Sequence, residues 1–485
     1  MHRVRARRLV RSLVKRPRGF GWLGGVSALV AAVGGIVLSQ SSTHAAPPHH
    51  AVSPPAVVHV SPFGPAAGTI QHGPLTLDAS WDRTAVLAHG ARVARMELTL
   101  QARGEAPERT PIAMAIVVDT SGSMSGAKLE QARNAVLQTI ERMRDADRVA
   151  VIAYDSVARM VVPLGEVGTR RALIRSSVIQ IAAGGGTQIP NGLALGHQAL
   201  EEVPTRFARR IVLLSDGIDD SGVGAHGART LSESYRNAGV STSALGIGLD
   251  YDEAFLMAVA AGGRGEYAFL ADGSELHAFL GRELDRATTT VADAIAVDLV
   301  LPPGFELGDA FGSTVEGRRV PIGPMSAGEQ RRVTLEVIAH AADPGALPPV
   351  QLAMSYRSAD VPFTSPTLAL HLGAVATEAD AETSVIPDVY ARAEAARLEM
   401  EQQRAVTLWR NGDTHAASQL ALGNAVALRE LQALAPSEAL SNQLAEVEQD
   451  NTRFQNVAPA SEAGRRFRLS SNARRRARVV TGTWQ

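Results

Sequence analysis

The segment IAMAIVVDTSGSMSG, residues 112–126, constrains the fold of this 485-residue chain more than any other. An apolar, β-branched run ends abruptly at Asp119, and Ser121 and Ser123 follow at alternate positions. Mg²⁺ prefers oxygen ligands in near-octahedral geometry and rarely finds a complete cage made of protein atoms. The segment therefore predicts a strand whose end supplies part of a hard-cation site and leaves room for a partner.

Two later segments add similar chemistry. The sequence GGGT ends in Thr187 after three glycines, which let the backbone approach a ligand closely. The sequence IVLLSDG is a second apolar strand, and Asp216 stands at its end before a glycine. Ligands of open α/β sheets gather at the carboxyl ends of the strands, so we expect Asp119 and Asp216 at the same edge.

Apolar strands alternate with helical patterns over residues 108–290. This alternation predicts an α/β fold with a doubly wound, mainly parallel sheet and helices on both faces. The strand MVVPL, residues 160–164, follows its predecessor too closely for a crossover helix. We therefore expect it to be an antiparallel edge strand.

These segments together resemble the von Willebrand factor type A (VWA) domain with its metal-ion-dependent adhesion site. The resemblance implies that five side chains surround Mg²⁺, with Mn²⁺ or Ca²⁺ as alternatives: Asp119, Ser121, Ser123, Thr187 and Asp216. It also implies an open coordination position for an Asp or Glu of a partner protein. The alternative interpretation is a Ser/Gly-rich loop and two capping aspartates, since these residues are common in strand-to-helix turns.

Short alternating strands separated by Pro/Gly turns flank this region, at residues 66–107 and 291–373. They predict an antiparallel β-sandwich in which the VWA-like domain is an insertion. The arrangement is similar to bacterial exported VWA proteins and to the extracellular part of calcium-activated chloride channel regulators.

The C-terminal third of the chain becomes helical. Residues 374–450 predict an α-helical hairpin broken at Asn411-Gly412, with a third short helix after Ser437. Residues 451–485 form a basic tail, which we expect to be disordered. Binding to an anionic lipid or surface polymer is the alternative for its arginines, which are Arg465, Arg466, Arg468, Arg474, Arg475, Arg476 and Arg478.

The N-terminus has the features of a targeting segment. Residues 1–45 contain a strongly basic start, an uncharged apolar run and a small-residue exit, which predict a signal peptide or a retained membrane anchor. Residues 46–65 are a Pro-rich linker. We therefore expect an exported protein, in the periplasm or at the cell surface. Anchorage to the cytoplasmic membrane is the alternative to a cleaved signal peptide.

Composition excludes several classes of function. A formal net charge of -1 argues against nucleic-acid binding, and the absence of cysteine rules out disulfides, thiolate metal sites and cysteine nucleophiles. The segment GSMSGAKL has too short a glycine spacing for a phosphate loop, and Leu129 stands where such a loop needs Ser or Thr. No HExxH motif is present, and no base is placed beside Ser121 or Ser123.

A second acidic group follows the metal-loop segments: Asp219, Asp220, Asp250, Asp252 and Glu253. We expect exposed turn and helix-cap roles, with Asp252 as a cap, and the alternative is a calcium site or a charge that tunes partner preference.

The sequence thus predicts a non-enzymatic, metal-dependent protein-binding or adhesion module. Two other classes remain open: an accessory subunit of an envelope assembly that works with an ATPase or channel, and a metal-dependent hydrolase. The sequence leaves open the partner's identity, the operating metal and the oligomeric state.

Overall fold

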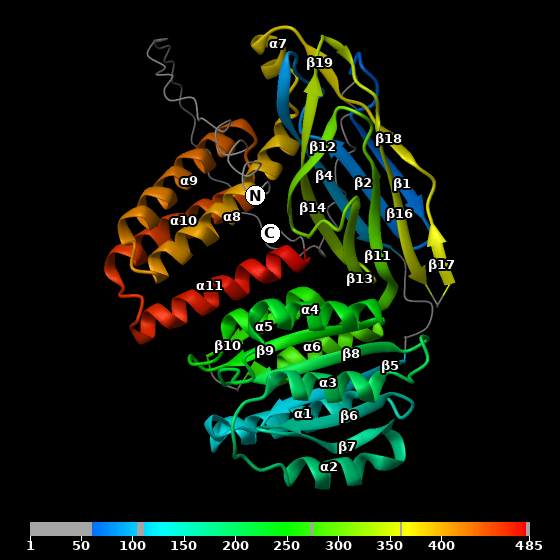
Figure 1. The fold of residues 1–485 in the computed structure, drawn as a ribbon, viewed down its shortest axis with the longest axis vertical. Helices are drawn as coiled ribbons and strands as arrows, with labels where there is room; N and C mark the ends of the chain where they lie inside the picture. The colour runs from blue at the N-terminus through cyan, green and yellow to red at the C-terminus, as the bar shows by residue number, and fades with distance from the viewer. Residues whose placement is uncertain (1–60, 104–110, 272–274, 359–360, 482–485) are drawn as a thin grey trace, which may run out of the picture. The chain divides into compact units, whose positions relative to one another are not determined.

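The computed structural model describes residues 61–103, 111–271, 275–358 and 361–481 (Figure 1). The expected signal peptide or anchor over residues 1–45, and most of the expected linker over residues 46–65, lie outside these ranges. Within the described ranges, no helix is both long and apolar enough to cross a membrane.

The central domain is built on a six-stranded sheet with strand order β10-β9-β8-β5-β6-β7. Its strands are β5 (Ile112–Asp119), β6 (Arg148–Tyr154), β7 (Ala158–Glu166), β8 (Ala208–Ser215), β9 (Val240–Ile247) and β10 (Arg264–Leu270). All neighbouring strands pair in parallel except β7, which pairs antiparallel with β6 at the edge. The predicted parallel sheet with an antiparallel edge strand is confirmed.

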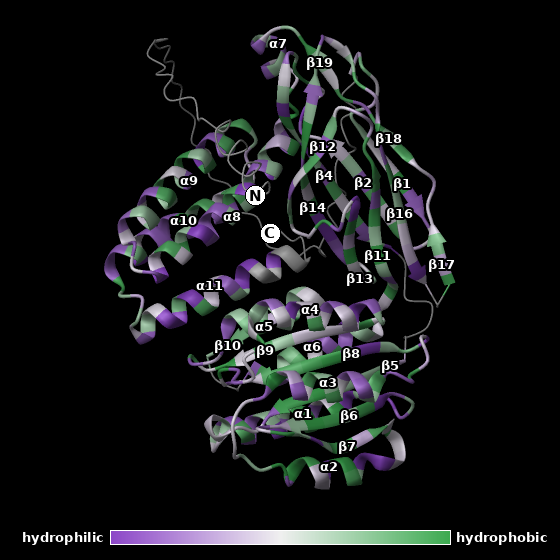
Figure 2. Cartoon of the chain, viewed as in Figure 1, coloured by the Kyte–Doolittle hydropathy of each residue, from purple (hydrophilic) through white to green (hydrophobic). Residues whose placement is uncertain are grey.

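Helices cover both faces of this sheet. The first face carries α1 (Ala127–Arg142), α2 (Arg171–Ile179) and α6 (Leu276–Thr288), and the second carries α3 (Ile189–Leu200), α4 (Gly224–Asn237) and α5 (Glu253–Gly263). Along β5, Ile116 packs against the first group and Val117 against the second, because successive side chains of a strand point to opposite faces. Both faces are therefore covered, and strands such as β6 and β8 are largely hydrophobic (Figure 2).

Helix α3 lies unusually close to the sheet. A β-carbon at Gly192 would lie 2.8 Å from the Tyr154 ring and 2.9 Å from a methyl of Val117. Glycine at this position lets the backbone of α3 pack directly on β5 and β6, which fixes the loop that precedes the helix.

The flanking segments form two antiparallel sheets with one shared hydrophobic core. The first sheet has the order β1-β2-β4-β14-β12, and its strands are β1 (Ala67–His72), β2 (Leu75–Trp81), β4 (Gly90–Ala102), β12 (Phe305–Phe311) and β14 (Gln330–Ala341). The second has the order β13-β11-β16-β17 with β18 on β16, and its strands are β11 (Thr290–Val300), β13 (Arg319–Ser326), β16 (Val350–Ser358), β17 (Val361–Thr364) and β18 (Leu368–Leu370). A small third sheet joins β3 (Ala85–Leu87), β15 (Gly345–Ala346) and β19 (Gly373–Val375).

Strands from before and after the central domain pair directly with each other. The β4–β14 ladder runs from Gly90 opposite Ala341 to Gln101 opposite Gln330. The central domain is therefore an insertion in the β-sandwich, as the sequence predicted.

The C-terminal region contains five helices within the described residues. They are α7 (Glu378–Thr383), α8 (Pro387–Arg410), α9 (Thr414–Leu434), α10 (Glu438–Asn456) and α11 (Glu462–Thr481). The predicted hairpin corresponds to α8 and α9, which are separated by Gly412 at a φ of 90° and by Asp413, whose carboxylate accepts the Ala416 N–H at 3.0 Å. Three aromatic rings from α8, α10 and α11 pack together in the core: Trp409, Phe454 and Phe467.

The expectation of a disordered tail over residues 451–485 differs from the structure, which has α10 to Asn456 and α11 from Glu462 to Thr481. Arg475 is buried and forms ion pairs with two buried carboxylates, Glu399 at 2.7 Å and Asp450 at 2.9 Å. These long-range pairs order a segment whose composition alone resembles a solvated tail.

We predict that Arg475→Met destabilises the helical region by about 3–5 kcal/mol, because two buried carboxylates lose their nearest counterion. Arg429→Met is the matched control, since Arg429 and its partner Glu448 are about half exposed, and such pairs contribute about 0–1 kcal/mol. Urea unfolding followed by far-UV circular dichroism measures both. Equal unfolding midpoints for the two variants would contradict the assigned role of Arg475.

Candidate metal centre

Asp119 is the last residue of β5 and is fully buried. One carboxylate oxygen accepts the Ser121 N–H at 2.8 Å, and the other accepts the Ser215 hydroxyl at 2.7 Å and the Tyr154 hydroxyl at 3.3 Å. Burial raises the pKa of Asp119, and the hydrogen bonds from Ser215 and Ser121 oppose that rise. The carboxylate is therefore held in one orientation by groups from three neighbouring segments.

The two serines of the first loop connect Asp119 to Asp216. The Ser121 and Ser123 hydroxyl oxygens lie 2.9 Å apart, and the Ser123 hydroxyl donates to Asp216 at 2.7 Å. Asp216 directly follows β8, the strand beside β5, and is 2% exposed. Ser123 itself is exposed, so the cluster reaches solvent on its side.

The GGGT loop lies against the first loop through backbone hydrogen bonds. The Gly184 N–H donates to the Thr120 carbonyl at 2.8 Å, and the Gly122 N–H donates to the Gly185 carbonyl at 3.2 Å. Gly185 has a φ of 85°, a conformation that favours glycine. These two sequence-predicted loops are thus brought together by their backbones.

Thr187 lies beside the residue that follows Asp216. A β-carbon on Gly217 would lie 2.8 Å from the Thr187 hydroxyl oxygen. Thr187 is buried, at 7% exposure. The structure therefore gathers all five sequence-predicted residues at the edge where β5 and β8 end.

Two residues that position the GGGT loop belong to the acidic group for which exposed turn and helix-cap roles had been expected. Asp220 accepts the Thr187 N–H at 2.9 Å and the Gln188 side-chain amide at 2.8 Å, and Asp219 accepts the Ile189 N–H at 3.1 Å. The available signal was their position four and three residues after Asp216, on the same sheet edge as Thr187.

The other acidic residues follow their expected roles in part. Asp252 caps α5 by accepting the Phe255 N–H at 3.0 Å, as predicted. Glu253, however, is buried and accepts from Asn472 of α11 at 2.7 Å. It is a packing contact of the C-terminal helix, not an exposed turn residue.

Lys128, near the start of α1, forms an ion pair with Asp216. Its side chain is 38% exposed, whereas the Asp216 carboxylate is fully buried. The buried Asp216 carboxylate therefore has a positive partner, as a buried charge requires. A metal ion at this edge would supply positive charge to the same carboxylate.

The donor set fits a hard divalent cation. Two carboxylates carry the charge needed to balance it, and three hydroxyls add neutral oxygen ligands of the kind Mg²⁺ accepts. Among the described residues, no group of three or more His, Asp or Glu side chains is arranged to hold a metal. The hydroxyl-rich cluster at Asp119 is thus the candidate supported by the donor chemistry.

The fold and this cluster define a class of protein: a doubly wound α/β domain with a cluster of carboxylate and hydroxyl side chains at the carboxyl edge of its sheet. Residues 114–282 match the family model of the von Willebrand factor type A domain, so the chain contains a domain of this family. Domains of this family typically mediate protein–protein interactions and are generally non-enzymatic.

Comparison with known proteins agrees with this assignment. An uncharacterized protein of Synechocystis is 31% identical over 196 residues, which are 39% of this chain and 46% of that protein. Human inter-alpha-trypsin inhibitor heavy chain H4 is 31% identical over 159 residues, 30% of this chain and 17% of that protein. The chain therefore spans less than half the length of these relatives.

A solved structure, a von Willebrand factor type A protein from Catenulispora acidiphila, extends the similarity of fold. It has a TM-score of 0.66 at 18% identity and covers 82% of this chain and 96% of its own. The shared fold therefore includes parts beyond the VWA domain.

We predict that Asp220→Ala loosens the GGGT loop, because the Thr187 N–H loses its acceptor. Amide exchange of residues 184–188 should accelerate about tenfold, in line with the loss of a hydrogen bond to a charged group. Hydrogen-exchange mass spectrometry measures this. Asp250→Ala, at a carboxylate that is 81% exposed, serves as the control, and the same exchange in both variants would show that Asp220 does not hold the loop.

Proposed function

We propose that this protein binds Mg²⁺, with Mn²⁺ or Ca²⁺ as alternatives, and uses the site to capture an Asp or Glu side chain of a partner protein. The residues that would hold the cation are Asp119, Ser121, Ser123, Thr187 and Asp216. The observation that carries the proposal is the continuous contact from Asp119 through Ser121 and Ser123 to Asp216 at one sheet edge.

Each residue has a distinct part in this proposal. Asp119 is fixed by Ser215 and Tyr154, so its geometry is preorganised before a cation binds. Ser123 is exposed and contacts Asp216, which places the accessible side of the cluster at the first loop. A bound divalent cation would supply a coordination position that an incoming carboxylate can occupy. Specificity would then come from the surrounding loops, since a carboxylate is common to all acidic partners.

We further propose that the protein is not an enzyme. Among the described residues that hydrogen-bond to the five side chains, none is a histidine placed as a general base. Lys128 is paired with Asp216 and carries a positive charge in that pair. These features favour binding over metal-assisted hydrolysis.

The setting we propose is outside the cytoplasmic membrane, in the periplasm or at the cell surface. The basic start and apolar run within residues 1–45 support export. The accessible partners would then be other envelope or extracellular proteins.

We predict that Asp119→Asn weakens Mg²⁺ and Mn²⁺ binding at least about tenfold while leaving the fold intact, because the amide keeps the shape but loses the charge. Isothermal titration calorimetry measures affinity, and circular dichroism checks the fold. Asp250→Asn is the matched control for loss of a loop carboxylate. Unchanged metal affinity in Asp119→Asn would reject the proposed site.

Partner capture is tested with the same variants. Immobilised wild-type protein in Mg²⁺ should retain envelope proteins that both a chelator and Asp119→Asn release. Retention that neither treatment changes would reject the metal bridge even if a metal binds.

A separate prediction concerns Lys128. Replacing it with methionine removes an ammonium that competes for Asp216, so Lys128→Met should bind Mn²⁺ several-fold more tightly than wild type. Calorimetric titration in parallel with wild type measures the difference. Weaker binding would show instead that Lys128 supports the metal-binding geometry.

A further inference from the structure

Three large hydrophobic side chains are exposed in the loops at the carboxyl edge of the VWA sheet. They are Val157, in the turn between β6 and β7, and Ile218 and Val223, in the segment between β8 and α4. Ile218 is 67% exposed, more than any other large hydrophobic side chain in the described parts of the chain. Single exposed hydrophobic residues are normal on soluble proteins, but three in the loops of one edge are a common feature of that edge.

Ile218 lies next to the candidate metal centre. It stands two positions after Asp216, and Gly217 between them lies against Thr187. Ser123, which is exposed, donates its hydroxyl to the same Asp216 at 2.7 Å. An apolar side chain therefore stands in water beside the part of the cluster that a partner can reach.

Hydrogen bonds on both sides of Ile218 hold its main chain in place. The Asp252 N–H donates to the carbonyl of Gly217, directly before Ile218, at 3.0 Å. Two positions after Ile218, the Asp220 N–H donates to the Thr187 carbonyl, also at 3.0 Å. The loop therefore presents this side chain to solvent in a fixed position. Because isoleucine is branched at its β-carbon, the side chain has few rotamers to lose when a partner covers it.

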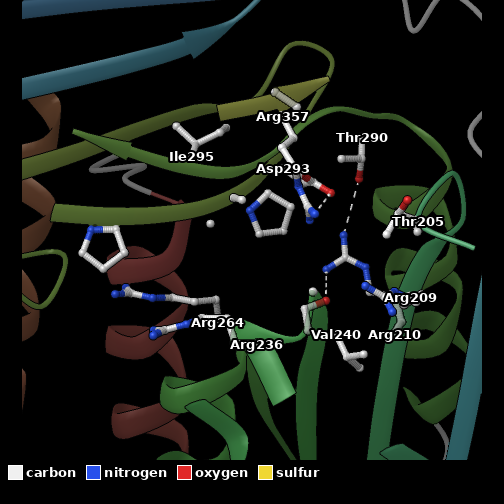
Figure 3. Close-up of a pocket in the computed structure, with 18 of the residues that line it drawn as sticks. Thr205, Arg209, Arg210, Arg236, Val240, Arg264, Thr290, Asp293, Ile295 and Arg357 are labelled. Carbon is white, nitrogen blue, oxygen red and sulfur yellow. Dashed lines mark hydrogen bonds and ion pairs between the residues drawn. The ribbon is translucent and has the colours of Figure 1, made fainter. Parts of the chain in front are cut away.

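The opposite edge of the sheet faces the sandwich. Figure 3 shows Arg210 opposite Thr290, and Asp293 beside Arg357, around the space between these two parts of the chain. The Arg210 guanidinium donates to the Thr290 hydroxyl at 3.4 Å, and Arg357 pairs with Asp293 at 2.9 Å. The sandwich therefore limits access to that edge, whereas Ile218 is exposed at the carboxyl edge.

Asp220 sets the charge beside Ile218. It is exposed, and its carboxylate accepts the Thr187 N–H at 2.9 Å and the Gln188 side-chain amide at 2.8 Å. Neither of these donors carries a charge, so both leave the negative charge of Asp220 in place. A second acidic residue of a partner is therefore disfavoured here, and an apolar residue is not.

We propose that Ile218 is a specificity-determining residue of the proposed capture site, and that the partner segment carries an apolar residue within two positions of its Asp or Glu. Val157 and Val223 would extend the apolar contact. The spacing follows from Asp216 and Ile218, which are two residues apart, a span of at most about 7 Å. Two residues of an extended partner segment cover a similar length. The inference rests on the proposed function and names the chemistry of the partner, since a carboxylate alone does not distinguish acidic proteins.

The test selects phage-displayed random peptides on the immobilised full chain in Mg²⁺, with elution by EDTA. Wild type should yield peptides in which Asp or Glu stands within two positions of a branched aliphatic or aromatic residue. Peptides with adjacent acidic residues should be depleted, because Asp220 lies beside Ile218. A parallel selection on Asp119→Asn identifies peptides that bind elsewhere on the protein.

Variants locate the apolar contact. A selected peptide, titrated by calorimetry in Mg²⁺, should bind Ile218→Ser about tenfold more weakly than wild type, as expected for the loss of one buried branched side chain. Ile218→Val should keep most of the affinity. The affinity of Ile218→Ser for Mg²⁺ alone should match wild type, because Ile218 supplies no oxygen ligand.

Leu173→Ser is the matched control for loss of an exposed apolar side chain. Leu173 is 58% exposed on α2, which follows the end of β7 that pairs with the start of β6, at the opposite edge of the sheet. Acidic peptides without an apolar preference, or equal peptide affinity in wild type and Ile218→Ser, would overturn the inference and leave the proposed metal bridge standing. If EDTA elutes no acidic peptides, the metal bridge itself is rejected and the inference falls with it.

Discussion

The pairing of β4 with β14 is the contact on which the arrangement of the domains depends. It joins a strand before the VWA domain to a strand after it along their whole length, and it buries Leu98 and Leu335 in the sandwich core. The chain enters the VWA sheet where β5 begins and leaves it after α6, directly into β11. The sandwich is therefore attached at the edge where the parallel strands begin, and the edge that carries Asp119 is the opposite one.

Strand β8 spans the distance between these two edges of the sheet. Arg209 and Arg210 lie near its start, on the side of the sandwich, and Asp216 directly follows its end in the candidate metal centre. At roughly 3.3 Å per residue, seven residues separate the two ends by about 20 Å. The contacts with the sandwich and the candidate metal centre therefore lie at separate ends of the same strand.

The sequence was sufficient for features whose signal is local. The strand ending at Asp119, the glycines before Thr187 and the strand before Asp216 each mark a turn by their own residues, and parallel pairing then brings these turns to one edge. The fold class could be predicted for the same reason. Each strand or helix pattern, and each turn residue between them, is recognised from a few neighbouring positions.

Features that depend on long-range partners were not visible in the sequence. Asp220 looked like a turn residue because its partner, the Thr187 N–H, lies 33 positions earlier. The prediction of a disordered C-terminal tail was wrong for the same reason. The local run of arginines is typical of a solvated tail, but Arg475 has buried acidic partners far away in the sequence.

Helix α11 brings the C-terminal region into contact with the VWA domain near the candidate metal centre. Leu469 packs in the VWA core, whereas Phe467, two residues earlier, packs with the C-terminal helices. Arg468 pairs with Glu253 at 2.9 Å, at the start of α5. The preceding residue, Asp252, donates its N–H to the carbonyl of Gly217 at 3.0 Å, and Gly217 directly follows Asp216. These contacts link α11 to the start of α5 and the start of α5 to the loop that carries Asp216. The C-terminal helices therefore help to fix that loop, in addition to the sheet of the VWA domain.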